Sequence, residues 1–262
     1  MKLILIDIIS KGIKLAAEIC SASLTGAEVA SCDVSFTPGV IKLPRDYSAD
    51  PGTAGSTTLL LQVSVPCLVF SGSSSLAPST LTLRGGTNAT MAPQIDYAQH
   101  IFLPFLRRHF GLDLTLHVKK RGYFPRGGGE IFCSVPPVLG PLPSVTLTNR
   151  GSITSIKGQA HVGGLPYHIA LKMRDSARDR LISAGYEPGI INIDSMREMD
   201  GVTVGSGGGV VLWAETSSGC LIGGTAVSSK GTDPADIGRI ASEELIRNLE
   251  HGGCVDEYLQ VD

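Results

Sequence analysis

The 262-residue sequence lacks the features that mark membrane, secreted and fibrous proteins. No apolar run reaches the roughly 18 residues of a membrane-spanning helix, so no membrane partner is expected. The apolar N-terminal run is interrupted by Asp7 and has no small-residue cleavage site, which argues against a signal peptide. The glycines show no three-residue period, which excludes a collagen-like chain. These absences predict a soluble, intracellular protein.

The sequence also lacks a basic excess and a paired-cysteine motif. Its 22 Lys and Arg residues oppose 24 Asp and Glu residues, which gives a formal net charge of −2. Proteins that bind along the phosphate backbone of a nucleic acid normally carry a clear excess of basic residues. Any contact of this chain with RNA or DNA must therefore be local. The six cysteines form no C-x-x-C, which favours buried free thiols in a reducing compartment.

Familiar catalytic and metal-binding signatures are missing as well. The glycine spacings fit neither a Walker loop nor a dinucleotide fingerprint, and no nucleophile elbow, zinc pattern or paired-carboxylate motif occurs. The six histidines have no partner at metal-ligand spacing, so each is interpreted as structural or exposed. The residues alone indicate an anion-binding protein and leave open whether it acts on nucleic-acid ends.

What the first 140 residues do contain is an alternation of helical and strand periodicity. The order helix, glycine, strand and Pro-containing turn occurs twice, which indicates a weak internal repeat. Asp96 is expected to cap the second helix. We therefore expect an α+β fold in which repeated helix-on-sheet units form a large domain. The predicted segments are helices at 10–22 and 97–109, a helix or strand at 59–70, and strands at 29–36, 81–83, 112–118 and 131–135.

A proline-rich stretch at 136–143 is the best linker candidate, and the pattern changes beyond it. Asp233 and Pro234 form an N-cap and first-turn pair that opens a helix. The sequence thus predicts a second, smaller α+β module followed by a short tail. Its predicted segments are strands within 145–163 and at 190–193, 210–215 and 220–227, and helices at 166–184 and 234–249.

The first glycine cluster is Arg84-Gly85-Gly86, which follows a strand. Glycines there let backbone N–H groups approach an anion, and a helix N-terminus adds partial positive charge. A tight turn followed by a helix cap explains the same residues. A further tract, Gly205–Gly209, has no basic neighbours and is expected to form a flexible loop.

The second cluster runs from Arg121 to Gly129 and ends the densest basic stretch, where six of the 22 basic residues fall within 20 positions. Arginine beside three glycines suits a phosphate or an RNA end, and Tyr123 or Phe124 is available for base stacking. A solvated corner between a helix and a strand is the alternative interpretation.

These clusters resemble the RNA 3'-terminal phosphate cyclase family. RGYFPRGGGEI (121–131) is similar to the family signature, and RGGTNATMAPQIDY (84–97) looks like the true cyclases. Shorter similarities extend the resemblance over about residues 12–260: TGAEV, TAGS, AETSSGCL and HGGCVDEYLQ. The resemblance implies a large domain at 1–143, an inserted domain at 144–251, and a return to the large domain at 252–262.

The resemblance also implies a reaction and its binding residues. ATP would adenylylate an enzyme histidine, AMP would pass to an RNA 3'-phosphate, and the 2'-hydroxyl would close a 2',3'-cyclic phosphate. Mg²⁺ or Mn²⁺ would offset the triphosphate charge. Gln62 looks like the glutamine that contacts the nucleotide, and Pro93 and Tyr258 resemble the pair that sandwiches adenine. Arg84, Arg121 and Arg126 are candidate phosphate or RNA contacts by charge and motif position.

Two departures from the family pattern lead to the expectation that the chain is truncated at both ends. The segment 1–10 resembles nothing in the family, and no histidine follows Tyr258, so no nucleophile is assigned and no enzyme–AMP adduct is expected. A non-catalytic cyclase-like factor in RNA processing or ribosome assembly is the alternative function, and a poorly folded fragment is a third. Similarity to eukaryotic members implies the nucleus, and otherwise the cytoplasm.

Overall fold

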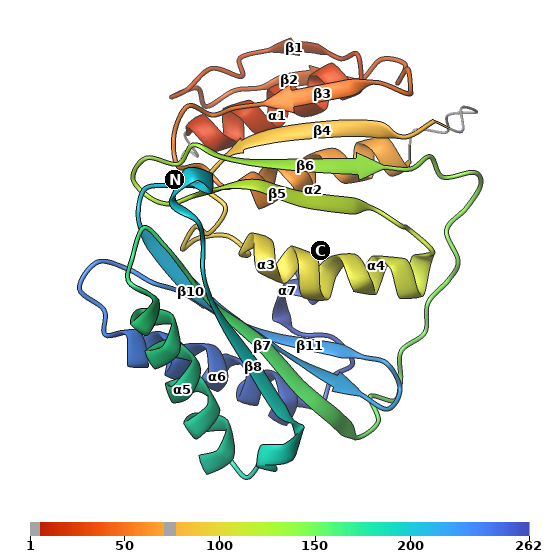
Figure 1. Cartoon of the computed structure of the whole chain (residues 1–262). Coiled ribbons are helices and arrows are strands. Elements are labelled where there is room, and N and C mark those ends of the chain that lie inside the picture. Colours follow the sequence, from red (N-terminus) through yellow and green to blue (C-terminus); the bar gives the residue numbers. More distant parts are fainter. Residues whose placement is uncertain (1–5, 71–76, 262) are drawn as a thin grey trace.

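The structure is a computed structural model that describes residues 6–70 and 77–261, and it has the expected α+β fold (Figure 1). The first half contains α1 (Asp7–Ile19), β1 (Ser23–Thr25), β2 (Ser35–Thr37), β3 (Asp46–Ala49), α2 (Thr57–Val69), β4 (Ser79–Gly85), α3 (Ile95–Tyr97), η1 (Ala98–Phe102), α4 (Leu103–Phe110), β5 (Thr115–Gly122) and β6 (Gly129–Val135). The second half contains β7 (Ile153–Gly163), α5 (Tyr167–Ser183), η2 (Pro188–Ile190), β8 (Ile191–Arg197), η3 (Asp200–Val202), β9 (Thr203–Val204), β10 (Gly207–Thr216), β11 (Leu221–Val227), α6 (Pro234–His251) and α7 (Glu257–Val261).

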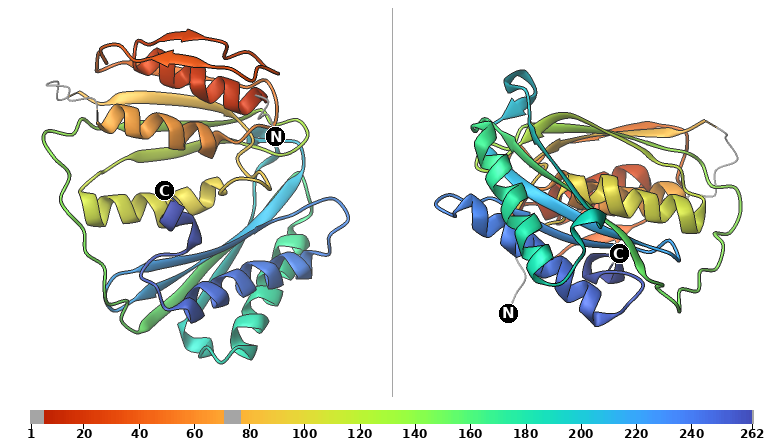
Figure 2. Two further views of the ribbon diagram at one scale, coloured as in Figure 1. Left: turned by 180° about the vertical axis from the view of Figure 1, so that it is seen from behind. Right: turned by 60° about the horizontal axis from the view of Figure 1, so that its bottom comes forward.

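The larger sheet has the strand order β3-β4-β6-β5-β9. Side chains alternate between buried and partly exposed along β4 and β6, so one face of this sheet is covered and the other meets solvent. The covered face packs against α1, α2 and the α3–α4 segment in one hydrophobic core. Figure 2 shows the α3–α4 segment, in yellow, between the larger sheet and the smaller one, while α1, in red, lies at the far end of the larger sheet.

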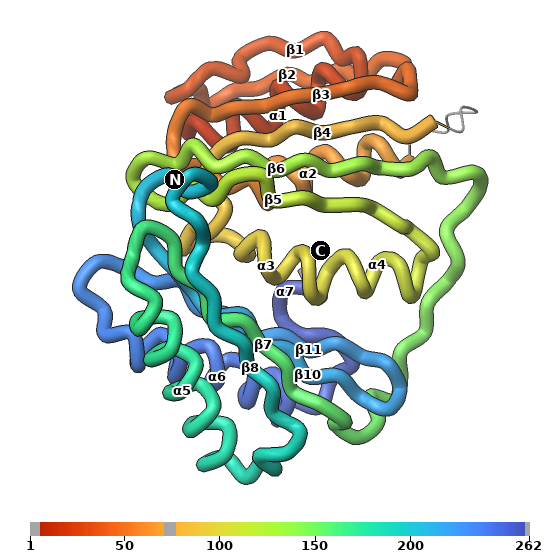
Figure 3. The backbone as a smooth tube through the Cα atoms, viewed as in Figure 1, coloured from red at the N-terminus to blue at the C-terminus, as the bar shows by residue number. Residues whose placement is uncertain are grey.

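The smaller sheet has the order β11-β10-β7-β8 and is buried on both faces at its centre. Val210 and Leu212 face α5 and α6 in a second core. Val211, on the opposite face, packs with Tyr97 and Ile101 in a third cluster, so the α3–α4 segment contacts both sheets. Residues 136–152 contain no helix or strand and connect β6 to β7 along one side of the molecule (Figure 3).

Several sequence predictions are confirmed and others are corrected. Segment 59–70 is a helix, and Asp233 caps α6 by accepting from Ala235 N–H. The strand predicted at 29–36 is wrong except at its end, because only Ser35–Thr37 is extended in a sheet. The strand within 145–163 begins only at Ile153. The domain boundary at residue 143 stays a prediction.

Two corrections have a tertiary cause. Asp96 does not cap the helix: the N-cap residue Gln94 makes no side-chain capping bond, and the Asp96 carboxylate pairs with Arg121 instead. Gly207–Gly209 is not a flexible loop but opens β10. A Cβ at Gly207 would run into the Tyr123 ring and one at Gly209 into the Gln94 amide, so glycine is needed there for close packing.

The six cysteines are all free, as expected, although only Cys133 and Cys220 are buried. Among the described residues, no helix is both long and apolar enough to cross a membrane.

Candidate functional site

Three glycine-containing loops meet at the N-terminus of α2. Gly86 N–H donates to the Gly55 carbonyl at 2.8 Å, and a Cβ at Gly85 would collide with that same carbonyl. Gly127 lies against the carbonyl of Thr53 with a positive φ of 61°, a conformation that favours glycine. The glycines of the two arginine-flanked clusters therefore allow backbones to approach closely, as the tight-turn interpretation requires.

Pro93 lies against the same helix as Gln62. The Thr58 hydroxyl donates to the Pro93 carbonyl at 2.7 Å, and Thr58 and Gln62 are one turn apart on α2. Ser56 caps this helix by accepting from the N–H groups of Thr58 and Leu59. The structure thus brings Gln62 and Pro93 to one side of α2.

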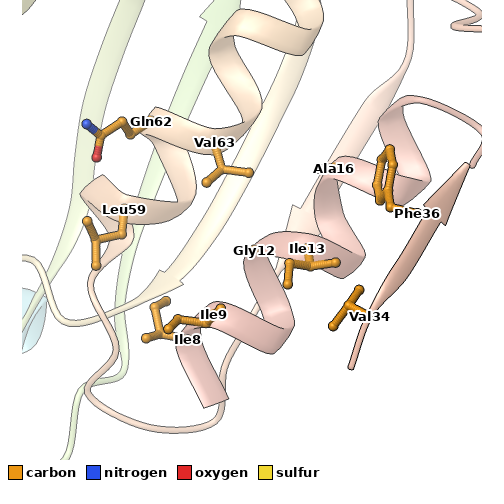
Figure 4. Close-up of a pocket in the computed structure, with 10 residues that line it drawn as sticks. All are labelled: Ile8, Ile9, Gly12, Ile13, Ala16, Val34, Phe36, Leu59, Gln62 and Val63. Carbon is orange, nitrogen blue, oxygen red and sulfur yellow. The ribbon is translucent and has the colours of Figure 1, made fainter. Parts of the chain in front are cut away.

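Gln62 also stands at the edge of an apolar groove of about 540 Å³ between α1 and α2 (Figure 4). Figure 4 shows Val63 facing α1 while the Gln62 side chain points away from it. Gln62 is the one polar side chain of this lining, whose other members are Ile8, Ile9, Gly12, Ile13, Ala16, Val34, Phe36, Leu59 and Val63.

Tyr258 lies near the C-terminal end of the described chain and packs against Tyr97. Its ring centroid lies 5.2 Å from that of Tyr97, which is one turn beyond Pro93 in the sequence. Tyr258 packs against the third hydrophobic cluster, and burial raises its pKa to about 12. Tyr258 therefore lies beside the short helical turn α3, which begins two residues after Pro93.

Arg121, a predicted phosphate contact, is instead the centre of a buried polar network. It is 5% exposed, and its guanidinium donates to both oxygens of Asp96 at 2.7 Å and to Glu198 at 2.9 Å. Burial by itself would raise the pKa of Asp96, but the Arg121 charge and its hydrogen bonds hold that pKa well below its usual range. In this structure the guanidinium group of Arg121 binds the carboxylates of Asp96 and Glu198.

The network also ties the segment 84–97 to the smaller sheet. Asn88 Nδ2 donates to Gln94 Oε1 and to Asp96 Oδ2, both at 2.9 Å. Gln94 Nε2 donates to the carbonyls of Val210 and Ala226 at 3.1 Å, on neighbouring strands β10 and β11. The polar residues of this motif thus hold the two sheets together, a role that sequence reasoning missed because its partners are more than 100 residues away.

His161 and Tyr123 lie beside the network without completing it. His161 is fully buried, its Nδ1 is 4.0 Å from Asp96, and neither ring nitrogen has a hydrogen-bond partner among the residues that the structure describes. Burial lowers the pKa of His161 to about 4, although Asp96 acts in the opposite direction. Tyr123 is also buried, so its ring is not available for base stacking, and its hydroxyl has no hydrogen-bond partner within the described parts of the chain.

The two other arginines that were predicted to contact phosphate or RNA, Arg84 and Arg126, are exposed at the surface. Arg84 is exposed and pairs with Glu130 across the strands at 2.8 Å. Arg126 is exposed on the turn between β5 and β6, two residues after Phe124, whose side chain is 81% exposed. Of the two predicted stacking candidates, only Phe124 presents its ring to solvent.

No group of three or more His, Cys, Asp or Glu side chains in the described parts of the chain is placed to hold a metal ion.

Comparison with known proteins adds a family match. The family model described as RNA 3'-terminal phosphate cyclase matches residues 8–262. The RNA 3'-terminal phosphate cyclase of Staphylothermus marinus is 36% identical over 251 residues, which is 94% of this chain and 68% of the relative. That of Pyrobaculum aerophilum is 34% identical over 248 residues, 95% of this chain and 68% of the relative. A probable RNA 3'-terminal phosphate cyclase of Dictyostelium discoideum is 32% identical over 253 residues, 95% of this chain and 57% of the relative.

Proposed function

This chain belongs to the RNA 3'-terminal phosphate cyclase family, and from that premise we propose that it binds ATP and RNA 3'-phosphate ends for the ATP-dependent formation of a 2',3'-cyclic phosphate. We propose the reaction order that the family resemblance implies: ATP transfers AMP to a histidine and releases pyrophosphate, the AMP passes to the RNA 3'-phosphate, and the 2'-hydroxyl attacks and releases AMP. None of the six histidines of this sequence is assigned as the nucleophile. A phosphate monoester dianion resists attack, whereas an adenylylated phosphate can expel AMP.

Two contacts support the ATP part: the Thr58 hydroxyl of α2, one turn before Gln62, donates to the Pro93 carbonyl, and the Tyr258 ring lies 5.2 Å from the ring of Tyr97, four residues after Pro93. An adenine ring held between Pro93 and Tyr258 would bury both its faces, and Gln62 would supply a polar contact.

For the RNA end we propose the turn that carries Phe124 and Arg126, together with Arg84. An exposed ring suits stacking of an unpaired base, and exposed guanidinium groups suit phosphate. The proposed phosphate contact of Arg121 requires that its guanidinium leave Asp96 and Glu198, so we rank it after the other two.

A divalent ion, Mg²⁺ or Mn²⁺, is proposed as a companion of the triphosphate. Because the described residues form no three-member ligand group, we assign it no protein ligands and no step. A nuclear location, or a cytoplasmic one outside eukaryotes, stays a prediction.

The test measures ATP affinity by titration calorimetry for the chain and its Tyr258→Ala variant. Loss of base stacking is expected to weaken ATP binding by about tenfold. Tyr167→Ala removes a tyrosine that is 43% exposed at the start of α5, and it serves as the matched control with unchanged affinity. Equal ATP affinity in the Tyr258 variant and the native chain would contradict the proposed site.

The alternative function is that of a non-catalytic RNA-processing or assembly factor. Formation of a covalent protein–AMP adduct distinguishes the cyclase reaction from this alternative. The chain is incubated with ATP labelled in its α-phosphate and with Mg²⁺ or Mn²⁺. Acid-labile, protein-bound AMP supports the cyclase reaction. Binding of RNA that ends in a 3'-phosphate without any labelled protein supports the factor.

A further inference from the structure

Asp256 is a buried carboxylate immediately before α7, and it is 1% exposed. Both of its oxygens accept hydrogen bonds. Oδ1 accepts from the Tyr97 hydroxyl at 2.6 Å and from Leu259 N–H at 3.1 Å, and Oδ2 accepts from Gly223 N–H at 2.7 Å. A buried carboxylate needs such partners, and these come from three separate elements: α3, α7 and β11.

The bond to Leu259 has the form of a helix N-cap. Helix α7 has five residues and is too short to be stable by itself, so its position depends on this cap and on the packing of Tyr258 and Leu259. The carboxylate is therefore the polar anchor of the helix that carries Tyr258.

Tyr97 connects the carboxylate of Asp256 to the ring of Tyr258. Its hydroxyl donates to Asp256, while its ring lies 5.2 Å from the Tyr258 ring. The Tyr97 bond fixes the surface on which Tyr258 rests, and the Leu259 bond fixes the backbone next to it.

The strand beneath the carboxylate of Asp256 has a glycine, Gly223, at the point of contact. A Cβ at Gly223 would lie 2.8 Å from the Tyr97 ring and 2.9 Å from Asp256 Oδ2, so no side chain fits there. On the other side, Asn248 Nδ2 donates to the Gly223 carbonyl at 2.9 Å and ties this strand to α6. Asp256 thus binds a strand, β11, that is also hydrogen-bonded to α6.

We propose that Asp256 is a positioning residue that holds the Tyr258 ring at the nucleotide site through Tyr97 and the N-terminus of α7. This inference rests on the proposed function only in taking Tyr258 as a nucleotide contact. Asp256 acts through Tyr258 and touches no nucleotide itself.

The first experiment is a double-mutant cycle on ATP affinity, measured by titration calorimetry. Asp256→Ala is expected to weaken ATP binding by about fivefold to tenfold, and Tyr97→Phe, which keeps the ring and removes one hydrogen bond, by about threefold. If Asp256 acts through Tyr258, the Asp256→Ala/Tyr258→Ala double variant binds ATP no more weakly than Tyr258→Ala alone. Additive losses would overturn the proposal.

The second experiment reads the position of α7 without nucleotide. Amide hydrogen exchange of the segment 254–259 is expected to be faster in Asp256→Ala and to a smaller extent in Tyr97→Phe, because the cap is lost or its partner is gone. The matched control is Asp233→Ala, which removes the exposed N-cap of α6 and should leave exchange at 254–259 and ATP affinity unchanged.

The two experiments distinguish the two ideas. If Tyr258→Ala binds ATP normally, the proposed nucleotide site fails, and exchange at 254–259 still decides whether Asp256 positions α7. If Tyr258→Ala weakens binding while Asp256→Ala changes neither affinity nor exchange, the site stands and the positioning role is wrong.

Discussion

The two arginines of one glycine-rich segment, Arg121 and Arg126, occupy opposite environments. Arg121 is 5% exposed and is neutralised by Asp96 and Glu198, whereas Arg126 stands in solvent on the turn that follows. Phe124 and Tyr123 repeat the contrast, one ring exposed and its neighbour buried. A single motif therefore combines an inner part that holds two sheets together with an outer part that is available to a ligand.

The contrast has an energetic reason. A buried charge is costly unless its hydrogen-bonding capacity is met, so the inner part tolerates little change. An exposed charge is already solvated, so the outer part is free to change without loss of the fold. The following predictions test whether the motif divides in this way.

Arg121→Ala is expected to have the largest effect, because it leaves the carboxylate of Asp96 buried without its charge partner. Removal of one member of such a pair costs about 3–5 kcal/mol of unfolding free energy. Urea unfolding followed by circular dichroism measures the loss. Arg121→Lys keeps the charge but not the two-pronged geometry, and it should lie between the alanine variant and the native chain. A loss below about 1 kcal/mol in the alanine variant would mean that the inner part does not hold the sheets together.

The pH dependence of stability should report the buried His161. Burial lowers its pKa in the folded state to about 4, against 6.5 for an ordinary histidine. The unfolded chain therefore binds a proton that the folded chain excludes, and stability present above pH 6.5 is lost as the pH falls toward 4. At about 1.4 kcal/mol per pH unit, this loss amounts to about 3 kcal/mol.

Urea titrations at several pH values measure this effect. His161→Leu removes the group that titrates, so the variant should lose less stability than the native chain over the same pH window. The difference between the two curves isolates His161 from the other titrating groups. If stability falls with pH by the same amount in the variant and in the native chain, His161 does not contribute to the pH dependence of stability.

Phe124→Ala tests the outer part, where the effect should fall on RNA binding and not on folding. Loss of one base-stacking contact is expected to weaken binding of a short RNA 3'-phosphate by about 1–2 kcal/mol, or roughly fivefold to thirtyfold. Fluorescence anisotropy of a labelled oligonucleotide measures it. Phe70→Ala, a change at another exposed phenylalanine, is the control with unchanged affinity.

Arg126→Ala should have the smallest effect. Stability is expected to change by less than about 0.5 kcal/mol, because the side chain is exposed. Affinity for RNA should fall modestly, and the slope of its logarithm against that of salt concentration should decrease by about one. A large loss of stability would erase the contrast with Arg121.

Local signals in the sequence were enough for much of the fold. The pair Asp233-Pro234 predicts the start of α6, and the helix predicted at 166–184 is α5, because capping and periodicity act within one or two turns. Family motifs also pointed to Pro93 and Tyr258. Their roles at a nucleotide stay predictions.

Other features depended on partners that no local pattern reveals. Asp96 has the position of a helix cap, yet its carboxylate pairs with an arginine 25 residues away. Glycines at 207–209 are typical of a loop, yet they form a strand that pairs with β7, and Tyr123 and Gln94 leave no room there for a Cβ. In both cases a contact between distant segments outweighed the local preference.

The sequence by itself determined the family, the α+β class and the helices whose caps and apolar spacing are local. Only the tertiary structure decided which charges of the glycine-rich motifs are buried and which meet solvent. Burial depends on how sheets and helices separated by many residues come together. The cost of removing a charge from water, and the partners that offset that cost, exist only once the fold has formed.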